Sequence, residues 1–238
     1  MSHGYRIDFG RPIPIFPLPG VALLPHGAQP LHLFEPRYRQ MVERCLAAGQ
    51  GNLHRAEPMA IAVIDEERTV PGEPVLLKDA VCIGRIARHE ELPDGRHNIL
   101  LQGLCRARID EIDEPHGERL FRRAWLRPLE DPSVSTPPML KIRESIRELF
   151  SGPRLSRMSA ASTVMEYIDR NEIPTSILLE LIGFAVIFDD DIRYQLLAEP
   201  ECRRRGELVE AELETMDRLV RQVDCQGFSD WPKGMSFN

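Results

Sequence analysis

Seven prolines fall between residues 12 and 36, and this density constrains the fold more than any other feature of the sequence. A helix cannot continue through them, and each proline removes one hydrogen-bond donor from a strand ladder. The whole chain holds 20 prolines in 238 residues, against about 12 for an average near 5%. Because the apolar residues between the prolines still require burial, we expect this segment to form short, edge-type strands broken by turns.

A helix is predicted directly after this segment, over residues 36–48. Pro36 can occupy its first position, and Gly49 is placed to end it. Apolar side chains recur at the helical spacing of three and four residues: Tyr38, Met41, Val42, Cys45 and Leu46. One face of this helix is therefore expected to pack on a sheet.

Residues 81–112 carry the clearest strand pattern, divided by a Leu-Pro-Asp-Gly turn at residues 92–95. Two further strands are predicted at residues 59–65 and 120–131. In the second strand of the hairpin, alternation predicts one apolar face, formed by Ile99, Leu101, Gly103, Cys105, Ala107 and Ile109. The opposite, solvated face is expected to carry Gln102, Arg106, Arg108 and Asp110. In the 120–131 strand the alternation places Phe121, Arg123 and Trp125 on one side.

The pattern changes at residues 131–133, where Asp-Pro-Ser opens a predicted linker. Everything after it has helical periodicity, and five helices are expected, at residues 142–150, 161–168, 174–188, 192–198 and 201–223. Ser159 is the expected cap of the second of these helices, and residues 189–191 (Asp-Asp-Asp) the cap of the fourth. The expected fold class is α+β, with a small β-barrel and one helix in residues 1–131 and a helical subdomain in residues 132–238.

Charge and composition exclude several classes of function. The net charge is −7, so no basic half exists to neutralise nucleic-acid phosphates. The only lysines are Lys78, Lys141 and Lys233, and none follows a glycine-rich loop, so a P-loop nucleotide site is excluded. The five cysteines show no CxxC spacing, which favours reduced thiols. With no signal-peptide pattern and no apolar run long enough to cross a bilayer, we expect a cytoplasmic protein without membrane contact.

No catalytic, metal or cofactor site is predicted. The hydrolase motifs GxSxG and HExxH are absent, and Lys141 lies on a helix pattern as a solvated residue. The histidines at 26, 32, 89 and 97 have no clustered acidic or cysteine partners, which favours ordinary surface histidines over metal ligands.

One segment is more specific. Residues 30–39 (PLHLFEPRYR), following residues 16–25 (FPLPGVALLP), resemble the opening of the Lon protease N-terminal domain family. Residues 83–86 (IGRI), 92–95 (LPDG) and 101–109 (LQGLCRARI) continue the resemblance in the same order. The match is strong over about residues 10–131. In the helical half, residues 195–198 (QLLA) and the arginines at 203–205 are similar to the family in a less specific way.

The resemblance implies a PUA-like β pseudobarrel followed by a C-terminal α-helical bundle. It also implies substrate recognition without catalysis, because this sequence lacks the AAA+ ATPase and Ser-Lys peptidase that follow the domain in full-length Lon. The sequence therefore resembles a stand-alone member of the family.

Two interpretations of the signature segment remain open. In the first, it only builds a strand-to-helix corner, with Phe34 and Tyr38 in the core, Glu35 capping or pairing with an arginine, and Pro36 starting the helix. In the second, part of this corner and the strand before it line a groove for extended apolar peptides. The candidate peptide-binding residues are Leu31, Leu33, Phe34, Glu35, Arg37 and Tyr38.

The favoured hypothesis is a non-enzymatic module that binds unfolded or partly folded polypeptides, as an adaptor or chaperone-like factor in protein quality control. A separate ATP-dependent protease is the second expected partner. The alternative is a PUA-like module for nucleic acid or a small ligand, with a local basic face formed by Arg106, Arg108, Arg119, Arg122, Arg123 and Arg127. Neighbouring acidic residues favour ion pairs over such a face. A peptidase is the least favoured hypothesis.

Overall fold

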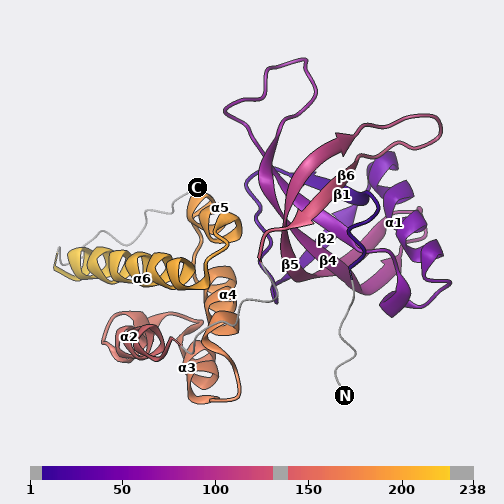
Figure 1. Cartoon of the computed structure of the whole chain (residues 1–238). Helices are drawn as coiled ribbons and strands as arrows, with labels where there is room; N and C mark the ends of the chain where they lie inside the picture. Colours follow the sequence, from indigo (N-terminus) through magenta and orange to yellow (C-terminus); the bar gives the residue numbers. More distant parts are fainter. Residues whose placement is uncertain (1–6, 131–138, 226–238) are drawn as a thin grey trace, which may run out of the picture.

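The computed structural model describes residues 7–130 and 139–225; the expected linker at residues 131–133 lies outside them. The chain forms a barrel-like sheet with α1 on one side and helices α2–α6 gathered on the other (Figure 1). The strands are β1 (Ile13–Leu18), β2 (Ala28–Leu33), β3 (Met59–Ile64), β4 (Leu77–Glu91), β5 (His97–Asp113) and β6 (Arg123–Pro128). The α+β prediction is confirmed.

The sheet closes on itself. Its strand order is β2-β5-β4-β3-β1-β6, and β6 also pairs with β5, so five strands form a ring to which β2 is attached through β5. The pairing of β1 with β3 is parallel, and the other pairings are antiparallel. Side chains from all five ring strands fill the interior: Ile13, Ile15, Ala60, Ala62, Leu77, Val81, Ile83, Ala107, Ala124 and Leu126.

The prediction of edge-type strands in the proline-rich segment is right for β2 and wrong for β1. Within the described residues, β2 pairs only with β5, whereas β1 lies between β3 and β6. An internal position is possible because β1 pairs with β6 only at Ile13 and Pro14, so most of one side of β1 needs no donor.

The predicted single apolar face of β5 is also wrong, because a β-bulge at Leu104 divides the strand. Ile83 pairs with Cys105 and Gly84 with Gly103, which leaves Leu104 as an extra residue. One extra residue moves the following side chains to the opposite face. Leu101 therefore packs outside the ring beneath α1 and the helices, whereas Ala107 points into it.

Helix α1 (Pro36–Ala48) has the predicted boundaries, with proline at its start and Gly49 as its C-cap. Its buried side chains are Tyr38, Met41, Val42 and Cys45, four of the five predicted. The Tyr38 ring meets the ring of Phe16 from β1 edge to face, with centroids 4.3 Å apart. The helix is thereby fixed to the outer face of the barrel.

The five C-terminal helices are α2 (Leu140–Ser151), α3 (Ala161–Asp169), α4 (Thr175–Ala185), α5 (Asp190–Ala198) and α6 (Cys202–Cys225). Asp189 caps α5 as predicted, accepting hydrogen bonds from the backbone N–H groups of Asp191 and Ile192. Ser159 does not cap α3, whose N-cap is Ala160 with no side-chain bond, because the helix begins one residue later than the capping pattern requires. No helix in the described part of the chain has the length and apolar character needed to cross a membrane.

The barrel and the helices meet at a buried ion cluster. Arg106 of β5 is 2% exposed and donates to Glu180 of α4 at 2.5 Å and to the Leu196 carbonyl of α5 at 3.2 Å. Arg205 of α6 bridges Glu180 and Glu130, at 3.2 and 2.7 Å. The predicted solvated position of Arg106 is therefore wrong, because the helices cover this face of β5.

Candidate functional site

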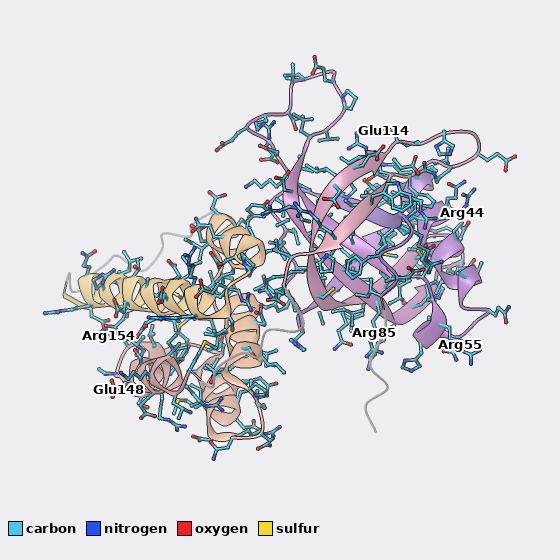
Figure 2. All side chains as sticks on the ribbon, in the orientation of Figure 1. Arg44, Arg55, Arg85, Glu114, Glu148 and Arg154 are labelled. Atoms are coloured by element: carbon cyan, nitrogen blue, oxygen red, sulfur yellow. The ribbon has the colours of Figure 1, made fainter. Side chains whose placement is uncertain are left out.

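A groove of about 520 Å³ opens where β1 and the chain before β6 separate. Its walls are residues 15–18 of β1 with Pro19 directly after the strand, residues 31–35 at and after the end of β2, and residues 120–122 before β6. Residues 73–75 and Glu114 complete the rim. Figure 2 shows Glu114 at the far end of the barrel, well away from α2–α6.

All six residues predicted from the signature segment line this groove. Leu31 is partly buried and Leu33 is 1% exposed, so the Leu33 side chain belongs mainly to the core. Phe34 is 60% exposed, which corrects the expectation that it lies in the core. It projects outward because it lies between the end of β2 and the start of α1, where neither element buries it.

Tyr38 is buried as predicted, and Glu35 pairs with an arginine as predicted. The Arg37 guanidinium lies 2.7 Å from Glu35 Oε2 and 4.5 Å from the centre of the Tyr38 ring. Burial raises the pKa of the Tyr38 hydroxyl, although the Arg37 charge acts in the opposite direction. The phenol is therefore neutral at physiological pH, and Tyr38 contributes to the lining of the groove.

The opposite wall is fixed by Arg122. Its Nε donates to Glu114 Oε2 at 2.9 Å and its Nη1 to the Val75 carbonyl at 2.8 Å. One side chain thus holds together two loops that are far apart in sequence. Leu120 adds an apolar surface to this wall and is 48% exposed.

Sequence reasoning missed this second wall. Leu120, Val75 and Arg122 lie in segments whose local pattern shows no common feature. They come together only through barrel closure. The only related signal is at the end of β1: Pro17 and Pro19 indicate that this strand has an unpaired edge, but they do not identify the residues opposite it.

The arginines considered for a basic face are largely ion-paired in the structure. The described partners are Glu180 and Glu130 for Arg106, Asp113 for Arg119, Glu114 for Arg122, Glu57 for Arg123 and Asp110 for Arg127. The preference for ion pairs over a basic face is confirmed for these residues.

The expectation of surface positions holds for His26 and His32, which are exposed, and is wrong for His97. His97 is 2% exposed, and its Nδ1 lies 3.0 Å from Nε2 of His89. Its location at the start of β5, beneath α1, buries it. Within residues 7–130 and 139–225 no group of three or more His, Cys, Asp or Glu side chains is arranged to hold a metal ion.

A family model described as the ATP-dependent protease La (LON) substrate-binding domain matches residues 12–215, most of the chain. The chain belongs to this family.

Lon proteases of Escherichia coli K12 and Shigella dysenteriae are each 31% identical to it over 125 residues. That stretch is 51% of this chain and only 14% of either protease, so the chain spans a small part of these relatives.

Two solved structures share the fold of this Lon substrate-binding domain. A Lon N-terminal domain protein from Xanthomonas campestris has a TM-score of 0.55 at 19% identity, covering 84% of this chain and 98% of that one. The N-terminal domain of a Mycobacterium avium complex Lon protease has a TM-score of 0.61 at 15% identity, covering 86% and 98%. The fold expected from the signature residues is thereby confirmed for both the barrel and the helical part.

Proposed function

We propose that this Lon-type domain is a non-catalytic module that binds extended apolar segments of unfolded or partly folded polypeptides in the groove between β1, the β2–α1 corner and residues 120–122. The observation that carries the proposal is the exposure of Phe34. An aromatic side chain left 60% exposed at the rim of an apolar groove offers area that a ligand can bury. Membership of a family described as a substrate-binding domain supports the same function.

The groove has the features of a peptide site. Its apolar surface comes from Leu31, Phe34, Tyr38 and Leu120. Its charged groups are the ion pairs of Arg37 and Arg122 and the carboxylate of Glu73. A few placed polar groups around an apolar floor are typical of ligand sites. The nucleic-acid alternative loses its main support because five of its six arginines are paired with carboxylates.

Fluorescence anisotropy with a labelled, leucine-rich, unstructured peptide tests the proposal. We expect saturable binding to the full chain and a loss of about tenfold for Phe34→Ala, the scale of one well-placed apolar anchor. Phe188→Ala is the matched control, because Phe188 is 71% exposed but lies between α4 and α5, on the helical side. Absence of binding, or equal loss in both variants, would contradict the proposal.

As part of the same proposal, the domain delivers clients to a separate ATP-dependent protease. We expect the purified protease of the source organism to degrade a denatured client faster when the chain is added. Phe34→Ala should abolish the gain and Phe188→Ala should keep it. An unchanged rate with the wild-type chain would restrict the function to binding alone.

A further inference from the structure

The backbone of β1 itself forms one wall of the groove, and its chemistry restricts what can bind there. Five consecutive residues, 15–19, line the groove. Side chains of successive strand residues point to opposite faces, so an unbroken run of lining residues means that the main chain is part of the surface. The inference drawn from this wall rests on the proposed peptide-binding function.

One side of this main chain turns toward the groove. Ile15 N–H donates to the Arg122 carbonyl at 3.0 Å, so the peptide groups of Ile15 face β6. Because peptide groups alternate between the two sides of a strand, Pro17 faces the same way, and Phe16 and Leu18 face β3. Beyond Ile15 the opposing chain leaves β1, since Leu120 N–H donates to Gln40 Oε1 at 2.8 Å instead.

This edge offers hydrogen-bond acceptors without donors. Pro17 has a carbonyl oxygen and no N–H, and Pro19 repeats the same feature. Among the lining side chains, the carboxylates of Glu35 and Glu114 are paired with Arg37 and Arg122, and the exposed carboxylate of Glu73 adds a further acceptor and a negative charge.

We propose that the edge of β1 selects its ligand by this acceptor-only chemistry. The occupant is an extended polypeptide segment with apolar side chains and a flanking basic residue. One amide N–H of the segment donates to the Pro17 carbonyl, and its basic side chain faces the carboxylates of the rim. A segment with proline at that register cannot donate and is rejected. The same prolines prevent β1 from pairing with another strand in full register.

An ester scan of the ligand tests the inference with the wild-type chain. The probe is a short fluorescein-labelled peptide of alternating leucine and serine with lysine at both ends. In each variant one amide N–H is replaced by an ester oxygen. We expect one register to lose about fivefold to tenfold in affinity, the scale of one hydrogen bond, and the remaining positions to change less than about twofold. In the all-amide peptide, replacing both lysines by glutamates should also weaken binding, because the rim of the groove carries carboxylates.

A pair of variants in β1 provides the matched control. Pro17→Ala adds an N–H donor on the groove side, and we expect binding to strengthen by about threefold or more. Pro14→Ala changes a residue whose peptide group faces β3, and affinity should stay within about twofold.

The outcomes separate the two proposals. If the all-amide peptide binds, but every ester is tolerated and Pro17→Ala behaves like Pro14→Ala, the acceptor-only edge is wrong and the groove function stands. If the all-amide peptide does not bind at all, the proposed function itself fails and the inference fails with it.

Discussion

Two aromatic residues of one corner, Phe34 and Tyr38, have opposite environments. Tyr38 is 7% exposed against Phe16, whereas Phe34 is 60% exposed at the groove rim. One of the two interpretations of this segment places both residues in the core. Helical spacing supports that position for Tyr38 but does not determine the direction of the Phe34 side chain. Residue 34 stands where the side-chain period changes from two to 3.6, so neither pattern determines its direction.

The stability effects of truncating these two rings should therefore differ. We expect Tyr38→Ala to lower the free energy of unfolding by about 3 kcal/mol or more, since a buried ring leaves a cavity. Phe34→Ala should change it by less than about 0.5 kcal/mol. Urea denaturation followed by tryptophan fluorescence measures both values, and a comparable loss in the two variants would show that Phe34 is structural.

His89 and His97 form the second residue-scale feature that sequence reasoning missed. Their rings lie with centroids 5.2 Å apart, and Glu43 of α1 lies 3.6 Å from His97 Nε2. Partial burial and then the neighbouring His97 lower the pKa of His89 below its ordinary value of 6.5, with Glu91 acting in the opposite direction.

A pH dependence of stability follows from the His89 pKa. At pH values between the lowered pKa of His89 in the folded state and 6.5, His89 binds more protons in the unfolded chain than in the folded chain. Its contribution to stability is therefore fully present above pH 6.5 and decreases as the pH drops below 6.5. We expect His89→Gln to flatten this part of the curve from urea titrations between pH 5 and pH 8. An unchanged slope would mean that other groups carry the dependence.

At the scale of elements, locally determined features were predictable and those set by barrel closure were not. The boundaries of α1 and the Asp189 cap follow from nearest-neighbour patterns and are confirmed. The bulge at Leu104 and the internal position of β1 depend on strands distant in sequence. The same difference applies to the groove. The wall formed by the signature segment, residues 31–38, is continuous in sequence, whereas the wall around Arg122 is assembled from segments that are distant in sequence.

Gly103 of β5 is a position where the close approach of residues 24–27 leaves no room for a side chain. Its N–H donates to the Gly27 carbonyl at 2.9 Å, and a Cβ there would lie 2.2 Å from the Leu24 carbonyl oxygen. We expect Gly103→Ala to cost about 1–3 kcal/mol of unfolding free energy, as overpacking does.

Gly10→Ala is the control for this substitution, because its nearest neighbour is the exposed Asp8 side chain at 3.1 Å. Thermal denaturation should show a clearly larger decrease for Gly103→Ala. Equal melting temperatures would contradict the close approach of residues 24–27 to β5.

At the scale of the whole molecule, the buried ion cluster connects the barrel to the helices. Burial disfavours the charged form of Arg106. The carboxylates of Glu180 and Glu130 favour it more strongly, so the pKa of Arg106 is raised. A single hydrophobic cluster also includes residues of both parts, such as Leu101 and Leu178. The division into residues 1–131 and 132–238 as separate domains stays a prediction.

Replacing either Arg106 or Glu180 alone should reduce stability more than replacing both together. We expect Arg106→Met or Glu180→Met alone to cost about 3 kcal/mol, because each removes one of the two ionic partners of a buried charge, leaving Arg106 with Glu130 or Glu180 with Arg205. The double variant should recover a large part of that loss, and a double-mutant cycle by urea denaturation measures the coupling. Additive losses would show that the two side chains act independently.

Backbone hydrogen–deuterium exchange of the full chain, with and without the leucine-rich peptide, tests the central claim most directly. Binding in the groove should slow exchange in residues 15–19, 31–38 and 120–122 and leave α2–α6 unchanged. Protection confined to the helices, with none along these three segments, would contradict the assignment of the barrel groove as the polypeptide-binding site.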